Sequence, residues 1–248
     1  MKLSPRLLGI ATFVKNHSIV ADIGTDHGYI PVYLIEKNIS KKVIANDISK
    51  GSLKKAEEII EELGYERNIE TRLGNGLEVL KPFEVDTVII AGMGGPLIID
   101  IIKSNVQIAE TINNFILQPM IAADELRRYL YNNNFKIIDE KIVKEEDKYY
   151  EIIYAEHGKD YVEDEIYYEI SKKLVDKRDL QMKEYIQYKI KKTESILEKL
   201  DSEESEKAVE RKKELIEKLR QYREVLRCYE SFWYNEYYEW VGTILFSR

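Results

Sequence analysis

The sequence has few of the residues that build disulfides and metal centres. Its 248 residues include one cysteine, Cys228, and three histidines. A lone cysteine excludes an intramolecular disulfide and any CxxC-type metal motif, and three scattered histidines indicate no metal site. Because this composition is typical of a reducing compartment, we expect a cytoplasmic protein without a bound metal.

Long apolar runs are missing as well. No segment approaches the roughly 18 apolar residues of a membrane-spanning helix, so we expect no membrane partner. Pro5 and Arg6 interrupt the apolar stretch near the start, which resembles a signal peptide only superficially. It is better interpreted as an amphipathic helix that presents one apolar face, formed by Leu3, Leu7, Ile10 and Val14.

Acidic residues outnumber basic ones, which gives a formal net charge of -7. This balance argues against a general polyanion-binding protein. It does not exclude RNA, because a local basic patch on an acidic protein can still bind phosphates.

Short β-branched runs and helical patterns alternate between residues 18 and 156, which predicts βαβ units and a parallel sheet. The last two runs are separated only by a short polar turn, so they predict an antiparallel hairpin at the edge of that sheet. The predicted strands are 18–23, 42–47, 69–74, 86–92, 114–119, 136–145 and 149–156.

The character of the sequence changes after Gly158. Residues 161–229 contain no proline or glycine, and apolar side chains recur there at steps of four and three on either side of a polar stretch at 201–206. This pattern predicts two helices packed as an antiparallel coiled-coil hairpin. We therefore predict an α/β domain at 1–158 and a helical domain at 159–248. The aromatic tail at 231–248 must pack on the hairpin or on a partner chain, and the oligomeric state stays open.

The segment VADIGTDHGYIP, residues 20–31, joins the first strand to the next helix. Gly24 and Gly28 allow the backbone to approach a ligand closely. Asp26 occupies the middle glycine position of the pattern acidic-x-G-x-G-x-G, and its carboxylate would repel the pyrophosphate of a dinucleotide. S-adenosylmethionine has no phosphate and carries a sulfonium and an ammonium, which suit carboxylates at Asp22 and Asp26. The alternative is a turn with a purely structural role.

Polar residues and glycines end the next strands. Asp47 can accept hydrogen bonds from both ribose hydroxyls, although a helix cap is the alternative, for which Ser49 competes. Asn75, between Gly74 and Gly76, can bond an adenine edge. The segment AGMGGP, residues 91–96, opens the sheet for a ligand, and Met93 lines a methyl-transfer channel or simply packs. The fifth strand ends in Gln118 and Pro119.

In this order, DIGTDHGYIP, ANDI, GNGL, IIAGMGG and ILQP resemble the bacterial tRNA (adenine 22-N1)-methyltransferase family over about residues 3–158. The resemblance implies a Rossmann-like, S-adenosylmethionine-dependent methyltransferase sheet, mostly parallel with an antiparallel edge hairpin, and tRNA as the substrate. The helical hairpin agrees with this family in kind rather than by motif. The residues predicted to bind the cofactor are Asp22, Gly24, Asp26, Gly28, Asp47, Ile48, Asn75, Gly76, Gly92, Met93, Gly94 and Gly95.

Adenine N1 can attack a sulfonium methyl without a general base, and alkylation leaves the base cationic. We therefore predict catalytic roles for Asp26, which stabilises that charge, for His27, which orders Asp26, and for Gln118. The alternative is that Asp26 only holds the ammonium of the cofactor. Because N1 lies on the pairing edge, the base must leave its stack. Tyr29 is a candidate stacking surface, or else a core residue, and Pro119, on the same rim as Gln118, is also predicted to contact the substrate.

Basic residues of the helical region either follow the RNA backbone or form a solvated face paired with glutamates. The first group of them comprises Lys172, Lys173, Lys177, Arg178, Lys189, Lys191 and Lys192. Three other functions remain as rivals. They are a methyltransferase for a protein or small molecule, a non-catalytic nucleotide-binding or interaction protein, and an NAD-dependent oxidoreductase, which Asp26 and the edge hairpin disfavour.

Overall fold

The computed structural model describes the backbone of residues 1–201 and 205–245, and the side chains of these residues as far as Tyr229. The chain divides into two compact units, Met1–Glu163 and Asp164–Arg248. The aromatic tail at 231–248, for which we predicted a packing partner, lies outside the described side chains.

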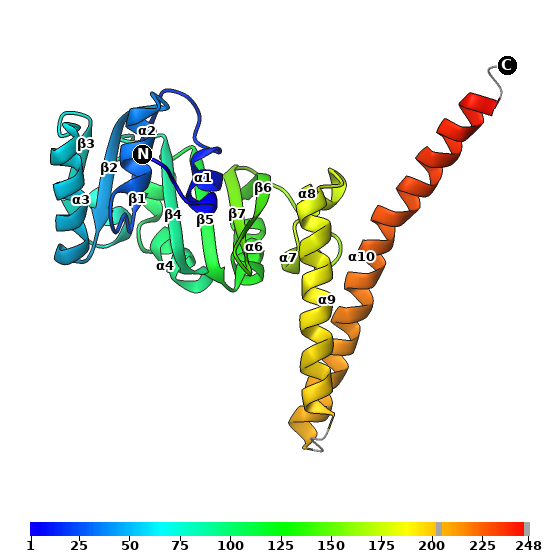
Figure 1. Cartoon of the computed structure of the whole chain (residues 1–248). Coiled ribbons are helices and arrows are strands. Elements are labelled where there is room, and N and C mark those ends of the chain that lie inside the picture. Colours follow the sequence, from blue (N-terminus) through cyan, green and yellow to red (C-terminus); the bar gives the residue numbers. More distant parts are fainter. Residues whose placement is uncertain (202–204, 246–248) are drawn as a thin grey trace. The chain divides into compact units, whose positions relative to one another are not determined.

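A mixed sheet of seven strands forms the centre of the first unit (Figure 1). Its order is β3-β2-β1-β4-β5-β7-β6, with β1 to β5 parallel and β7 antiparallel to both β5 and β6. The strands are β1 Ser18–Ile23, β2 Ser40–Asp47, β3 Ile69–Leu73, β4 Thr87–Gly94, β5 Asn114–Ile121, β6 Phe135–Glu145 and β7 Lys148–His157. The predicted fold class is confirmed, including the antiparallel edge hairpin.

Helices cover both faces of this sheet, and each face has its own hydrophobic core (Figure 1). Successive residues of a strand point to opposite faces, so Ala21 belongs to one core and Val20 to the other. On the Val20 face lie α1 Pro5–Ala11, α2 Tyr29–Glu36 and α3 Lys50–Leu63. On the Ala21 face lie the 3₁₀ helix η1 Gly76–Val79, α4 Gly95–Ser104, α5 Val106–Ala109 and α6 Ala123–Asn132.

The strand order reverses between β1 and β4. From β1 the chain proceeds outward to β2 and β3, and from β4 it proceeds in the other direction to β5. Loops on the two sides therefore diverge at the carboxyl ends of β1 and β4. Open α/β sheets bind their ligands in the crevice at such a point.

A buried ion triad fastens α6 to the edge hairpin. Arg127 of α6 is 1% exposed, and its guanidinium contacts Glu140 of β6 at 2.7 Å and Glu151 of β7 at 2.6 Å. Burial removes these charges from water, so loss of one partner would leave the others buried without compensation.

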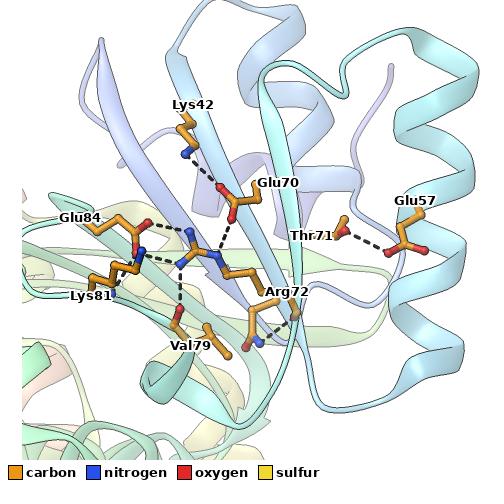
Figure 2. Close-up of polar contacts among 9 residues, drawn as sticks. Lys42, Glu57, Glu70, Thr71, Arg72, Val79, Lys81 and Glu84 are labelled. Atoms are coloured by element: carbon orange, nitrogen blue, oxygen red, sulfur yellow. Dashed lines mark hydrogen bonds and ion pairs between the residues drawn. The ribbon is translucent and has the colours of Figure 1, made fainter.

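A second polar network holds β3 against the segment that follows it (Figure 2). Arg72 donates two hydrogen bonds to the carboxylate of Glu84, at 2.8 and 2.6 Å, and one to the carbonyl oxygen of Val79 at 2.7 Å. Its Nε donates to Glu70, which also contacts Lys42. This bidentate geometry fixes the turn after β3, where Asn75 lies.

The second unit is helical. Two short helices, α7 Ile166–Glu169 and α8 Lys172–Asp176, precede α9 Leu180–Leu200 and α10 Glu206–Leu245. The two long helices run in opposite directions (Figure 1), with Ile186 and Thr193 of α9 and Leu215 and Leu219 of α10 buried. The predicted helix pair is present, and the short helices before it were not predicted.

Candidate active site

The turn after β1 begins with a glycine whose conformation other residues rarely adopt. Gly24 has φ +78°, and its N–H donates to the carbonyl of Asn46 at 2.8 Å. A Cβ at Gly24 would lie 2.2 Å from the Cε of Met93. Gly28 is buried, and a Cβ there would lie 3.1 Å from Ala56 of α3. Gly24 therefore faces the rim of the sheet, whereas Gly28 permits close packing of α3.

Asp22 lies almost fully buried at the carboxyl end of β1. Its carboxylate accepts a hydrogen bond from the hydroxyl of Thr25 at 2.7 Å. Burial raises the pKa of Asp22 to about 6, the Thr25 hydroxyl opposes the shift, and the nearby Asp47 adds to it. A cation bound near this carboxylate would therefore stabilise its charged form.

Asp47 ends β2 and organises the neighbouring backbone. One carboxylate oxygen accepts from the N–H of Ser49 at 2.7 Å, and the other accepts from the N–H of Asp26 at 3.2 Å. Ser49, not Asp47, caps α3 by accepting from the N–H of Ser52. The capping alternative for Asp47 is therefore wrong. Ile48 beside it is 72% exposed, an unusual position for a large apolar side chain.

The turn after β3 places Asn75 at the surface and Gly76 in the interior. The backbone N–H of Asn75 donates to Glu78 at 2.7 Å, which holds the start of η1. A Cβ on Gly76 would lie 3.0 Å from Ile101 of α4. Asn75 can therefore meet a ligand, whereas Gly76 serves packing.

The glycines at the end of β4 have different surroundings. Gly92 is exposed with φ +77°, and Met93 and Gly94 are partly buried. Gly95 is buried, and a Cβ there would lie 2.2 Å from the carbonyl oxygen of Ala122. Backbone cannot yield as a flexible side chain can, so Gly95 is required for contact between α4 and the segment after β5.

Gln118 is fully buried at the carboxyl end of β5, with its amide already bonded within the protein. Its oxygen accepts from Nη1 of Arg6 at 2.8 Å and from the N–H of Gly92 at 3.2 Å. Its nitrogen donates to the carbonyl of Pro119, which is also buried. The structure thus places Gln118 beneath Arg6 rather than on an open surface.

A cavity of about 460 Å³ opens where the strand order reverses. Its walls come from α1, the turn after β1, the start of α2 and the end of β4, and include Arg6, Gly24, Asp26, Tyr29 and Gly92. Sequence reasoning missed Arg6, because an arginine in a short amphipathic helix signals only an interruption of the apolar face. A second cavity, of about 540 Å³, surrounds Lys15 and Asp86 at the amino ends of the strands, where such sheets do not bind their ligands.

Three side chains on the cavity wall form a connected series. Nδ1 of His27 lies 2.6 Å from a carboxylate oxygen of Asp26. The His27 ring stacks on that of Tyr29, with centroids 5.2 Å apart and planes inclined by 14°. Tyr29 is 40% exposed and is therefore not a core residue.

The predicted basic residues of the helical unit are partly engaged within it. Lys189 lies 3.8 Å from Glu169 and above the rings of Tyr185 and Tyr222. Lys172 pairs with Asp176, and Arg178 donates to the carbonyl of Cys228. Lys177, Lys191 and Lys192 are exposed, and Lys173 is partly buried.

Among the side chains that the structure describes, those of residues 1–201 and 205–229, no cluster of metal-ligating groups occurs. In the same part of the chain, no helix combines the length and apolarity that crossing a membrane requires.

Comparison with known proteins identifies the class of protein to which this chain belongs. Residues 3–153 match the family model described as methyltransferase domain, the class to which a seven-stranded sheet ending in an antiparallel hairpin and an acidic, glycine-lined rim belong. The tRNA (adenine(22)-N(1))-methyltransferase of Bacillus subtilis is 39% identical over 158 residues, which cover 64% of this chain and 66% of that protein.

Two solved structures extend the likeness. A putative tRNA (m1A22) methyltransferase of Streptococcus pneumoniae, in complex with S-adenosyl-L-methionine, is 30% identical with a TM-score of 0.81, covering 91% of this chain and 100% of that one. TrmK of M. capricolum, in complex with S-adenosyl-homocysteine, is 29% identical with a TM-score of 0.79, covering 92% and 99%. The chain belongs to the TrmK-like tRNA (m1A22) methyltransferase family.

Proposed function

We propose that this protein transfers the methyl group of S-adenosylmethionine to N1 of adenine 22 in tRNA. The observation that carries the proposal is the crevice between β1 and β4, where carboxylates and exposed glycine backbone meet at one rim. Family membership supports the choice of donor and of acceptor.

The residues at this rim fit the donor. Asp22 and Asp26 supply negative charge close to Gly24, where the absence of a side chain leaves the backbone accessible. Asp47 suits ribose hydroxyls because each of its carboxylate oxygens accepts only one hydrogen bond within the protein and retains a lone pair. Ile48 and Asn75 offer an apolar surface and an amide to an adenine ring. We assign cofactor contacts to these residues and to Gly92, Met93 and Gly94.

The acceptor base is assigned to Tyr29 and Asp26, which line the same cavity as Gly24. The methyl donor supplies an electrophilic carbon, and the lone pair of adenine N1 forms the new bond as the carbon–sulfur bond breaks and its electron pair passes to sulfur. Tyr29, held against His27, offers a flat surface on which an unstacked base can rest. Asp26, held by His27, lies where it can stabilise the positive charge that develops on the base.

The helical unit is proposed to contribute to RNA binding through its exposed basic residues, Lys177, Lys191 and Lys192 among them. Lys189 is assigned a structural role instead, since it lies against Glu169 and two tyrosine rings.

Product analysis tests the proposed function. The protein is incubated with methyl-labelled S-adenosylmethionine and unmodified tRNA, the tRNA is digested, and the labelled nucleoside is identified and located. We expect 1-methyladenosine at position 22, and no label in a matched tRNA in which adenine 22 is replaced by guanine. Label in a protein or small molecule would contradict the assignment of substrate. Absence of donor binding by calorimetry would instead favour a non-catalytic protein.

A further inference from the structure

The residues assigned to the donor leave one of its charged groups, the carboxylate, without a partner of opposite charge. S-adenosylmethionine carries two positive groups, a sulfonium and an ammonium, and one negative group, the carboxylate of its methionine part. Asp22 and Asp26 suit the positive groups, but they and Asp47 would repel the carboxylate. Arg6 is the one residue with a permanent positive charge among those that line the cavity in the described part of the chain.

Arg6 is held at the carboxyl ends of β4 and β5 by contacts with neutral groups. Its Nη1 donates to the amide oxygen of Gln118 at 2.8 Å, and its guanidinium carbon lies 5.4 Å from the centroid of the Tyr150 ring. The same Nη1 lies 3.7 Å from the point where a Gly92 side chain would begin. Gln118 and Tyr150 therefore fix the direction of the guanidinium without neutralising it.

The acidic side chain that contacts Arg6 bonds to its backbone and not to its guanidinium. Glu145 of β6 accepts a hydrogen bond from the backbone N–H of Arg6 at 2.9 Å, which anchors α1 to the sheet. No ion pair joins the Arg6 guanidinium to an acidic side chain among the residues that the structure describes. A half-buried guanidinium that has only neutral partners is suited to bind an incoming oxyanion in the fork geometry that arginine favours.

We propose that Arg6 binds the carboxylate of the methionine part of S-adenosylmethionine, with Gln118 as the residue that positions it. The inference rests on the proposed function. The other oxyanion available to this protein is a phosphate of the tRNA. The carboxylate is favoured because Arg6 lies against Gly92 and lines the same cavity as Gly24, on the rim assigned to the cofactor.

Calorimetric titration with two ligands tests the assignment. S-adenosylmethionine and its decarboxylated form differ only in the carboxylate, so the comparison isolates the group that Arg6 contacts. We expect Arg6→Gln to weaken binding of S-adenosylmethionine by about 10- to 100-fold, the range for a hydrogen-bonded charged group. Binding of the decarboxylated form should change less than about threefold, because this ligand lacks the carboxylate that Arg6 would contact.

Two further variants control this experiment. Arg6→Lys keeps the charge and loses the fork, and should weaken binding of S-adenosylmethionine by a smaller factor than Arg6→Gln does. Arg67→Gln removes the same charge from the exposed turn before β3, an edge strand of the sheet, and should leave both affinities unchanged.

Two results would overturn the assignment. Equal losses for both ligands would show that Arg6 supports the turn or the fold rather than the carboxylate. Unchanged affinities together with a raised KM for tRNA would place the guanidinium against RNA. Failure of the wild-type protein to bind S-adenosylmethionine at all would instead overturn the proposed function and this inference with it.

Discussion

Asp22 combines burial with a raised pKa, and this has a defined consequence for stability. The pKa of its carboxyl group is raised to about 6 in the folded protein, mainly by burial. In the unfolded chain the group titrates near 3.9. Below that value it is protonated in both states, and above about pH 6 the folded protein must hold a buried charge. The contribution of Asp22 to stability is therefore fully present below the unfolded-state pKa and is lost as the pH rises through the folded-state pKa.

We expect Asp22→Asn to raise the free energy of unfolding at pH 8 by roughly 2–3 kcal/mol relative to wild type, and to change it little at pH 4. The amide removes the buried charge and can still accept from Thr25. Urea denaturation at the two pH values measures the difference. Asp100→Asn, on the exposed side of α4, is the matched control and should alter stability by less than about 0.5 kcal/mol at pH 8. A less stable Asp22→Asn protein at pH 8 would contradict this account.

Asp26 is exposed and bonded to His27, so its charge can be removed without opening the core. If it stabilises the charge that develops on the base, Asp26→Asn should lower kcat at least about tenfold, which corresponds to about 1.4 kcal/mol. The dissociation constant of S-adenosylmethionine should rise by a smaller factor than kcat falls, because Asp26 also supplies negative charge at the donor rim. Single-turnover kinetics and calorimetry measure the two quantities. Equal losses in both would assign Asp26 to cofactor binding alone.

At the scale of elements, Arg127 links α6 to β6 and β7 through two glutamates. We expect Arg127→Met to lower the free energy of unfolding by about 3–5 kcal/mol, because Glu140 and Glu151 would remain buried without their cation. Replacing all three residues, as Arg127→Met with Glu140→Gln and Glu151→Gln, should restore at least half of the loss. Denaturant titration measures both.

The adjacent Arg128 provides the control for this prediction. It is exposed on the same helix, so Arg128→Met should change stability by less than about 0.5 kcal/mol. If it destabilised the protein as much as Arg127→Met, the buried triad would not be the cause.

The positions and directions of the strands could be predicted because β-branched runs alternate with helical patterns, and those elements are confirmed within one or two residues. The short helices α7 and α8 have four and five residues, too few to show a period. The roles of the glycines could not be predicted because they depend on which residues lie next to them in the folded chain. Gly28 and Gly95 carry the same letters as Gly24 and Gly92, yet they face Ala56 and Ala122 rather than the rim.

The roles of Arg6 and Gln118 also depend on contacts between elements far apart in the sequence. A sequence pattern identifies strand ends, and it placed Gln118 correctly on β5. It could not show that the first helix folds back over that end and occupies the glutamine amide. The predicted roles of the other site residues remain predictions that binding and kinetic measurements must decide.

At the scale of the whole molecule, an acidic protein must bind an acidic polymer. The exposed lysines of α9 are the proposed contacts, so Lys191→Glu with Lys192→Glu should weaken tRNA binding and reduce the slope of log affinity against log salt by about 1 to 2. Filter binding at several salt concentrations measures this slope. S-adenosylmethionine affinity should not change.

The control reverses two lysines of α3, Lys54→Glu with Lys55→Glu, which gives the same net charge. An equal loss of tRNA affinity would indicate a general charge effect, and an unchanged slope in the α9 variant would remove these lysines from the RNA contact.

The two units differ in how much of their sequence their relatives share. The methyltransferase family model ends at residue 153, whereas the likeness in three dimensions extends over 91% of the chain. A helix pair with its own apolar seam can keep its shape through many residue exchanges, provided that the seam stays apolar. A residue exchange on the outer surface of the pair therefore changes the contacts made there without changing the fold.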